Sequence, residues 1–522
     1  MKATLFFRIC ILTTILFFFT NNMNLFSQVF TPVDFEAGGY VTELYSRWGR
    51  NEHTLYCRTD IGGVYSLSLN PPSSQWTFLS TYATSPAGLH VQGLAFKNPI
   101  IVPKLMVACG TDYMNTDPDR GVWKYDNIAW TKVLGPGAPS PNNIDINFGG
   151  NVFHSKVGGE CIVYFDSPNW KLIVGGRYSN STTHVSPIYY STDDGDTWTL
   201  VNNDAMRNFV TGNVSTIVAD PTNSSKIWVG TDEGIWLGNN NNGNWSWTKK
   251  KNATPPSGNI YNTPVHRIIM KQDASMIFVA QGEEVFRSTD DGVTWNPLSF
   301  DDAGVTNKVD NIISAVNLFD NDTKLLVSRI GWKLKEPRTK ISTDFGVTFG
   351  NNINMPLASP NPKHAQDDKF HAYYSKTNFL LDGDHWYCSG GAGPYKSVSS
   401  DIYGNWEYLV VDEPGRTHGI NMPVVYDVTF GLGTGQNSLI FIPIADWTLA
   451  RIENTNPLPM TPEGQIRIKD YARIETGNDD YVSNATRILV SADDPSIVYF
   501  TGGNLYINCY GSLFRSIDYG NT

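Results

Sequence analysis

The chain has 522 residues and a net charge of −11, and only 17% of its residues are charged. This length allows more than one domain or one large repeat architecture. The acidic balance and the lack of a basic cluster argue against a nucleic-acid partner and, weakly, against a polyanionic substrate. Abundant glycine and aromatic residues, without long runs of helical period, predict an all-β fold with many turns.

The N-terminal residues have the pattern of a secretory signal. Lys2 and Arg8 precede an apolar run from Ile9 to Phe19, and a polar stretch follows. The run is too short to cross a membrane. We therefore expect residues 1–28 to be a signal peptide, the mature protein to be secreted, periplasmic or at the cell surface, and no membrane partner.

The cysteines outside this signal are odd in number and irregular in spacing. They show no Cys-x-x-Cys or Cys/His pattern, so no metal site is predicted. We interpret them mainly as small buried core residues, although an oxidising compartment would also allow one or two disulfides. They are Cys57, Cys109, Cys161, Cys388 and Cys509.

The stretch from Arg58 to Tyr65 is predicted to form a hairpin. An apolar run, 54–57, leads into Arg58-Thr59-Asp60-Ile61-Gly62-Gly63, and an alternating run, 64–69, leaves it. Two β-type runs separated by a few Asp and Gly residues are typical of a hairpin, and the glycines let a ligand approach the backbone. Asp60 is then either a turn residue that hydrogen-bonds its own backbone or a carboxylate presented at the rim for catalysis.

A second motif recurs, in which an apolar strand end is followed by Ser-x-Asp-x-Gly-x-Thr and an aromatic residue. Its Ser and Asp side chains should hydrogen-bond the turn backbone, and its Gly should take the left-handed conformation. The motif resembles the Asp-box hairpin of sialidase-like propellers, which is structural and carries no chemistry. The four copies contain Asp193, Asp290, Asp344 and Asp518.

Degenerate hairpins fill the gaps between these copies, and together they recur every 45–70 residues or so, the spacing of propeller blades with long loops. Seven such units predict one seven-bladed β-propeller over residues 29–415, because a lone blade cannot bury both of its faces. The hairpins start near residues 63, 121, 188, 234, 285, 340 and 394.

The pattern restarts after residue 415. A strand at 437–443, a turn at Ala445-Asp446-Trp447-Thr448 and a strand at 449–453 repeat the arrangement around Asp60, and another strand follows at 496–500. We expect residues 416–522 to be the start of a second propeller, in tandem with the first, whose C-terminal part is missing from this sequence.

The chain resembles glycoside hydrolase family 74, the xyloglucan-cleaving enzymes, over about residues 36–522. The likeness rests on Gly38-Gly39-Tyr40-Val41-Thr42, on the stretch from Arg58 to Tyr65, on the stretch from Val107 to Tyr113, and on Phe148-Gly149-Gly150-Asn151 followed by Gly158-Gly159-Glu160. The resemblance implies two seven-bladed propellers with a cleft between them, and an inverting reaction that uses one aspartate from each.

The family's general base matches Asp60, and its general acid matches Asp446, although the turn at Asp446 lacks the family's two glycines. An inverting glycosidase needs an acid for the leaving oxygen and a carboxylate for water on the opposite face, about 6.5–9.5 Å apart. Trp447 beside Asp446 would favour the protonated acid, because apolar surroundings disfavour the charged form.

Aromatic residues near turns are candidates for stacking on a neutral glucan chain. We expect Trp447, Tyr113 and Trp48 to bind substrate, although packing in the core is an alternative for each. The same alternative applies, with no site assigned, to Trp332 and Trp386.

We expect a monomer that acts on a polysaccharide such as xyloglucan and needs no cofactor. The competing interpretation is a non-catalytic, sortilin-like propeller that binds glycan or protein. A third, an exo-sialidase, ranks last because the usual Arg-Ile-Pro start is absent.

Overall fold

The structure is a computed structural model, which describes the chain in separate segments. The predicted signal peptide lies outside these segments. The described residues are 41–48, 52–59, 63–73, 75–79, 90–97, 104–110, 120–126, 128–148, 160–177, 182–203, 209–253, 265–282, 284–300, 311–331, 338–353, 378–382, 384–389, 394–409, 429–432, 438–444, 448–454, 470–472, 484–491, 493–494, 496–504 and 509–517.

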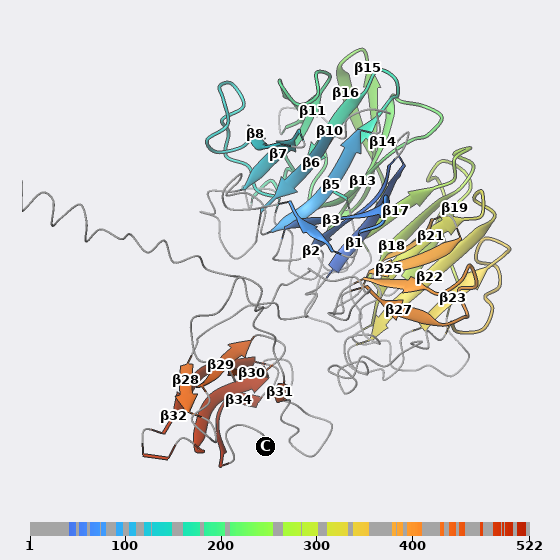
Figure 1. Ribbon diagram of the computed structural model, residues 1–522. Coiled ribbons are helices and arrows are strands. Elements are labelled where there is room, and N and C mark those ends of the chain that lie inside the picture. Colours follow the sequence, from blue (N-terminus) through green and yellow to red (C-terminus); the bar gives the residue numbers. More distant parts are fainter. Residues whose placement is uncertain are drawn as a thin grey trace, which may run out of the picture.

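These residues contain strands and turns and no helix, so they include no helix that could cross a membrane. Six four-stranded antiparallel sheets and one three-stranded sheet follow one another along residues 41–408, and each joins its strands in chain order. This result agrees with the all-β prediction (Figure 1).

The sheets contain the following strands. The first is β1 (Val41–Trp48), β2 (His53–Thr59), β3 (Val64–Asn70) and β4 (Thr77–Phe78); the second is β5 (Val91–Lys97), β6 (Lys104–Cys109), β7 (Gly121–Tyr125) and β8 (Trp130–Leu134); the third is β9 (Ile162–Phe165), β10 (Lys171–Gly175), β11 (Ile188–Ser191) and β12 (Thr199–Asn202). The fourth is β13 (Val214–Ala219), β14 (Lys226–Thr231), β15 (Gly234–Asn241) and β16 (Asn244–Asn252); the fifth is β17 (Val265–Met270), β18 (Ile277–Gln281), β19 (Glu284–Ser288) and β20 (Asn296–Pro297). The sixth is β21 (Asn311–Phe319), β22 (Lys324–Gly331) and β23 (Arg338–Ser342); the seventh is β24 (Asn378–Asp382), β25 (His385–Ser389), β26 (Tyr395–Ser397) and β27 (Trp406–Tyr408).

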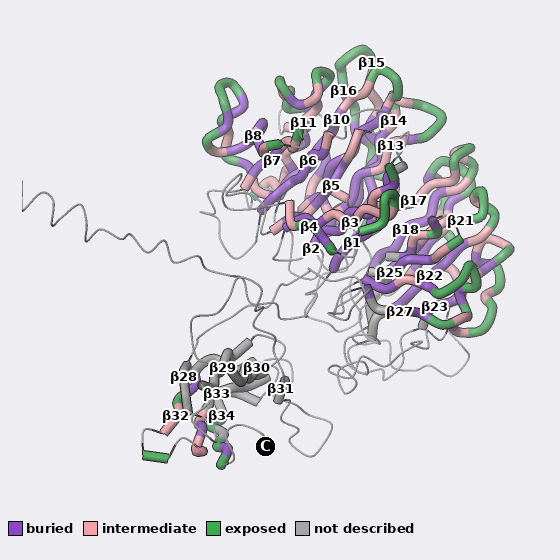
Figure 2. Tube along the Cα trace, in the orientation of Figure 1, coloured by how far each residue is buried: buried purple, intermediate pink, exposed green. Residues whose placement is uncertain are grey.

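Burial falls from the inner strands of a sheet to its outer strand. All five residues of β18 are buried, because the neighbouring sheets cover both of its faces. The outer strand β16 instead alternates, and it turns Trp245 and Trp247 inward while Asn244, Ser246 and Thr248 face solvent. Figure 2 shows the exposed residues gathered at the outer hairpins, which include the β15–β16 hairpin.

The seven predicted hairpins coincide with the third strands of the seven sheets. The period was readable because third strands such as β11, β19 and β23 end at the serine of a Ser-x-Asp-x-Gly-x-Thr turn. The predicted starts near 63, 121, 188, 234, 285, 340 and 394 compare with third strands that begin at Val64, Gly121, Ile188, Gly234, Glu284, Arg338 and Tyr395.

A recurring tryptophan contact links each of several sheets to the sheet before it. The indole N–H of Trp130 donates to the carbonyl oxygen of Leu79 at 2.8 Å, so it joins the second sheet to the first. The indole N–H of Trp247 donates to the carbonyl oxygen of Val201, and this bond joins the fourth sheet to the third in the same way. Trp76 of the first sheet donates to the carbonyl of Leu409, directly after the seventh sheet, at 3.2 Å.

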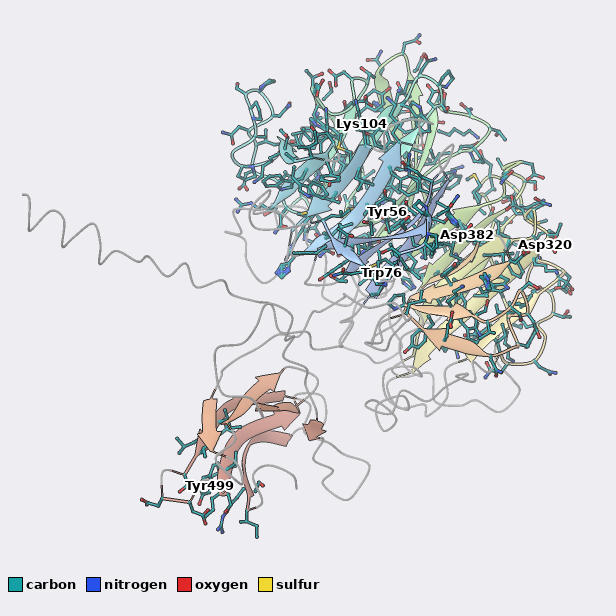
Figure 3. All side chains as sticks on the ribbon, viewed as in Figure 1. Tyr56, Trp76, Lys104, Asp320, Asp382 and Tyr499 are labelled. Carbon is teal, nitrogen blue, oxygen red and sulfur yellow. The ribbon has the colours of Figure 1, made fainter. Side chains whose placement is uncertain are left out.

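The first and last sheets share one hydrophobic core. Leu55 and Tyr65 of the first sheet pack in one cluster with Trp386 and Trp406 of the seventh, and all four are buried. Figure 3 labels Trp76 and Asp382, two residues that lie at this junction. Trp386 is therefore a core residue, the alternative that we gave it from the sequence.

The Ser-x-Asp-x-Gly-x-Thr turns form the hydrogen bonds that their sequence predicts. In the first, the Asp193 carboxylate accepts from the Ser191 hydroxyl at 2.8 Å and from the Thr197 backbone N–H at 2.9 Å. Gly195 has a φ of 83°, in the left-handed region. The turns of Asp290 and Asp344 repeat these bonds. Asp518 lies outside the described residues.

Residues 429–516 contribute one further, seven-stranded sheet (Figure 1). Its two halves are joined through a single parallel pair, Thr448 with Asn484. The strands predicted at 437–443, 449–453 and 496–500 are present as β29, β30 and β33. The sheet consists of β28 (Thr429–Leu432), β29 (Ser438–Ile444), β30 (Thr448–Asn454), β31 (Asp470–Ala472), β32 (Asn484–Val490), β33 (Val498–Asn504) and β34 (Cys509–Ser516).

Four of the five cysteines have described side chains, and all four are buried. This outcome agrees with their interpretation as small core residues. Burial raises the pKa of the Cys161 thiol to about 12, with a further contribution from the nearby Glu160 carboxylate.

Candidate functional site

The residues that the sequence singled out for catalysis lie beside described strands but not within them. Asp60 follows β2, and Asp446 with Trp447 follows β29; all three are outside the described residues, as is Tyr113. Trp48 ends β1, and its side chain is not described. The structure therefore defines the surroundings of the Asp60 turn, and the site is built below from those surroundings.

The starts of the first strands of neighbouring sheets lie together at one end. Arg58 of the first sheet donates to the carbonyl of Val91, where β5 begins, at 3.3 Å. The N–H of Ile313 in β21 donates to the carbonyl of Gly282, directly after β18, at 2.9 Å. We call this end the turn face, defined by the starts of β1, β5, β13, β17 and β21. Because Thr59 pairs with Val41 at the start of β1, the Asp60 turn begins and ends on this face.

The turn that holds Asp60 is closed by its two flanking residues. The backbone N–H of Thr59 donates to the Gly63 carbonyl at 3.0 Å, and the Thr59 hydroxyl donates to the same oxygen at 3.3 Å. Thr59 is fully buried, and Gly63 has a φ of 78°, which a residue with a side chain rarely adopts. The backbone on both sides of residues 60–62 is thus fixed.

Arg58 anchors the strand that leads into the turn. Its guanidinium is fully buried, and Nη1 donates to the Thr42 hydroxyl at 3.0 Å. Its Nε donates to the Tyr45 hydroxyl at 3.1 Å and to Glu160 Oε1 at 3.2 Å. A buried cation is stable only when it is paired and hydrogen-bonded, and these contacts meet that condition.

A second buried ion pair, Glu43 with Arg267, lies on the same face. Both guanidinium nitrogens Nη1 and Nη2 donate to the Glu43 carboxylate at 3.1 Å, so β1 of the first sheet is joined to β17 of the fifth. Burial raises the pKa of Glu43 to about 7, although the positive charge of Arg267 opposes the shift. Glu160 adds to the rise, because it is a like charge nearby.

The fourth sheet carries a turn that can be compared with the Asp60 turn. Thr231 ends β14 as Thr59 ends β2, and its hydroxyl donates to the Gly234 carbonyl at 3.3 Å. Asp232 follows, and its carboxylate accepts from the backbone N–H of Asn213 at 2.7 Å and from the Asn213 amide at 2.8 Å. Because both bonds stay within the fourth sheet, this aspartate is a structural residue; burial raises its pKa. The Thr59–Gly63 turn is one residue longer.

The next residue in the fourth-sheet turn, Glu233, is half-buried on the turn face. Its carboxylate lies 2.8 Å from His184 Nδ1 and accepts from the Thr211 hydroxyl at 2.5 Å. The contacts of Glu233 with His184 and Thr211 join the third and fourth sheets. The polar atoms that they present to solvent are of the kind that bind hydroxyl groups.

The opposite end of β2 carries a different polar group. His53 Nε2 lies against the Asp382 carboxylate of the seventh sheet, and the Ser46 hydroxyl donates to the same oxygen. Asp382 is buried, and its position is labelled in Figure 3. Because His53 starts β2 and Thr59 ends it, this group is separated from the turn face by the length of the strand.

Sequence reasoning missed the buried charges. Glu43 and Arg267 had no motif of their own, Arg58 was noted only as part of the turn, and Glu160 was noted only as the end of the family-like stretch Gly158-Gly159-Glu160. One signal was available: Arg267 interrupts the largely apolar strand Val265–Met270, where a charge is costly unless it is paired. The recurrence of Thr-Asp after an apolar strand at 59–60 and 231–232 would have identified the comparable turn.

The fold can be compared with known proteins. No family model and no curated protein sequence matches the chain. Among solved structures, a glycoside hydrolase family 74 xyloglucanase from Xanthomonas campestris aligns with a TM-score of 0.64 and 16% identity, over 94% of this chain and 67% of the other. The extracellular domain of a protein described as a hybrid two-component system, from B. thetaiotaomicron, aligns with a TM-score of 0.45 and 11% identity, over 91% of this chain and 52% of the other.

The second of these likenesses is too weak to carry an argument. The first is at low identity and therefore bears on the fold alone. It shows that the chain has a β-propeller fold of the kind found in that glycosidase.

Proposed function

We propose that the protein is an inverting glycoside hydrolase that cleaves β-1,4-glucan backbones such as xyloglucan. Two observations support this proposal together. The chain shares its fold with a xyloglucanase, and the family-like stretch from Arg58 to Tyr65 lies at a turn whose backbone is fixed on both sides. The second observation carries the proposal, because a catalytic carboxylate must be held by a rigid support.

In the proposed architecture, residues 29–415 form one closed seven-bladed propeller, and residues 416–522 begin a second one in tandem. The contact of Trp76 with the Leu409 carbonyl supports closure, because it repeats between the first and last sheets the bond that Trp130 makes between adjacent sheets. Residues 1–28 would direct export, and the enzyme would act as a monomer without a cofactor.

In the proposed reaction, Asp60 is the base and Asp446 is the acid. Asp60 removes a proton from a water molecule whose oxygen attacks the anomeric carbon. Asp446 donates its proton to the leaving glycosidic oxygen as that carbon–oxygen bond breaks. The attack from the opposite face inverts the anomeric centre. Trp48, Tyr113 and Trp447 would stack on the sugar rings of the substrate.

A non-catalytic propeller that binds glycan or protein is the second candidate. One sequence observation favours it: the turn at Asp446 keeps the aspartate but has Trp447 and Thr448 where the family has a pattern with two glycines. If this alternative holds, the protein binds xyloglucan oligosaccharides and releases no reducing ends.

To test this proposal, the unmodified protein is incubated with xyloglucan, mixed-linkage glucan and cellulose. New reducing ends from xyloglucan, with the α-anomer seen first by proton NMR, are the expected result, because inversion of a β-linkage yields the α-product. Binding without any new reducing ends would favour the second candidate. First formation of the β-anomer would contradict the two-aspartate inverting reaction.

A further inference from the structure

Glu160 lies where four consecutive sheets meet. Its Oε1 accepts from Arg58 Nε at 3.2 Å and from the Tyr45 hydroxyl, both in the first sheet. Its Oε2 accepts from the backbone N–H of Leu94, in β5 of the second sheet, at 2.6 Å. Glu160 itself precedes β9 of the third sheet, and its carbonyl accepts from the Ile217 N–H of the fourth at 2.6 Å.

The Arg58 guanidinium that Glu160 holds is the last buried charge before the Asp60 turn. Only Thr59 separates it from Asp60, and both Arg58 and Thr59 are fully buried. Arg58 contacts the first and second sheets through Thr42 and Val91. A displacement of this guanidinium is therefore transmitted to the turn along one stiff strand segment rather than absorbed by a flexible loop.

We infer that Glu160 is a positioning residue for the Asp60 turn, and that it acts through Arg58. The inference rests on the proposed function for its catalytic consequence. In this role Glu160 does not contact the substrate. It supplies the negative charge that keeps Arg58 in place, and Arg58 in turn fixes the end of β2.

Loss of that charge has a specific consequence. Glutamine at position 160 keeps an acceptor oxygen for Arg58, but it loses the charge that compensates the buried guanidinium. The guanidinium then moves toward solvent or water enters beside it, and the end of β2 shifts with it. Because misplacement of a catalytic group by about 1 Å costs on the order of 100-fold in rate, the effect falls on turnover rather than on substrate binding.

The experiment compares Glu160→Gln with Asp382→Asn in the full chain. Asp382→Asn is the matched control, because it also neutralises a carboxylate that contacts a side chain of β2, at the opposite end of that strand. We expect Glu160→Gln to lower kcat on xyloglucan by roughly 10- to 100-fold. Its KM should stay within about twofold of the wild type, and the control should keep its kcat within the same factor.

Amide hydrogen exchange of residues 60–62 supplies a readout that does not require activity. Exchange in this turn should be roughly 10-fold faster in Glu160→Gln and unchanged in Asp382→Asn, because only the first variant loosens local structure there. If Glu160→Gln does not fold, Arg58→Lys provides the same test, since lysine keeps the charge but loses the Nε donor.

The outcomes separate the two claims. Wild-type kcat and wild-type exchange at residues 60–62 in Glu160→Gln would overturn the positioning role, whether or not the enzyme cleaves xyloglucan. A wild-type protein without glucanase activity would refute the proposed function, and hydrogen exchange would still decide the positioning role.

Discussion

Thr59 and Gly63 close the turn that carries Asp60, through two hydrogen bonds to one oxygen. The backbone N–H and the hydroxyl of Thr59 donate to the Gly63 carbonyl at 3.0 and 3.3 Å. The fourth sheet closes its own turn with the same hydroxyl-to-carbonyl bond, from Thr231 to Gly234. The fold thus contains a built-in comparison between a turn proposed for catalysis and one that serves structure.

Replacement of Thr59 by Val should lower both stability and turnover. Valine fills nearly the same volume but removes the hydroxyl that donates to Gly63, at a cost of about 1 kcal/mol of unfolding free energy. Urea unfolding measures that loss, and kcat on xyloglucan measures the consequence for the turn.

The control is Thr231→Val, which removes the equivalent bond and one that the Thr231 hydroxyl accepts from the Glu233 N–H. This variant should lose at least as much stability and keep its turnover. Equal kcat values in the two variants would show that the Thr59–Gly63 closure has no special role.

Glu43→Gln should change the pH dependence of stability in a defined direction. The pKa of Glu43 is raised from 4.5 to about 7, mainly by burial, so the folded protein holds this proton more tightly than the unfolded chain does. The stability that the protonated Glu43 contributes to the wild type is therefore lost as pH rises from about 4.5 through about 7.

The variant carries no titrating group at this position and should gain up to about 3 kcal/mol relative to the wild type between pH 4.5 and 8. Thermal unfolding at a series of pH values measures this difference. Parallel curves for the two proteins would contradict the raised pKa.

Trp76→Phe should weaken the junction of the first and seventh sheets. It removes the indole N–H that donates to the Leu409 carbonyl and leaves that carbonyl without this donor, a loss of about 1–3 kcal/mol. Trp198→Phe is the control, because the Trp198 indole N–H has no hydrogen-bond partner among the residues that the structure describes. If both variants lose the same stability, the hydrogen bond contributes nothing to closure.

Protonation of the Asp290 and Asp344 carboxylates should destabilise the protein in strong acid. Hydrogen bonds from Thr294 and Thr348 lower the pKa values of these carboxyls to about 2. The stability that they contribute is present above the unfolded value near 4 and is lost as pH falls toward 2. In the double variant Asp290→Asn, Asp344→Asn, the denaturant midpoint should fall less steeply over that range than in the wild type.

The repeat of the fold could be predicted from the sequence because its signals are local. A short third strand and a Ser-x-Asp-x-Gly-x-Thr turn follow one another directly, as between Ile188 and Trp198. Each of these hydrogen bonds joins residues at most four positions apart, as in Ser191–Gly195, so composition and spacing are enough to locate them.

The buried polar contacts of the site could not be predicted in this way. Arg58 and Glu160 are 102 positions apart, and Glu43 and Arg267 are 224 positions apart. Nothing local links such residues, because they meet only once the sheets are packed around each other. The sequence therefore located the turn of Asp60, whereas the charges that support it became visible only in three dimensions.

The most direct test of the central claim compares Asp60→Asn with Asp232→Asn on xyloglucan. Asp232 follows Thr231 as Asp60 follows Thr59, but it binds Asn213 within its own sheet. We predict that Asp60→Asn lowers kcat by at least about 1,000-fold with little change in unfolding free energy, because loss of the base removes general-base catalysis of water attack. Asp232→Asn should lower stability and keep kcat. Retained turnover in Asp60→Asn would contradict the account.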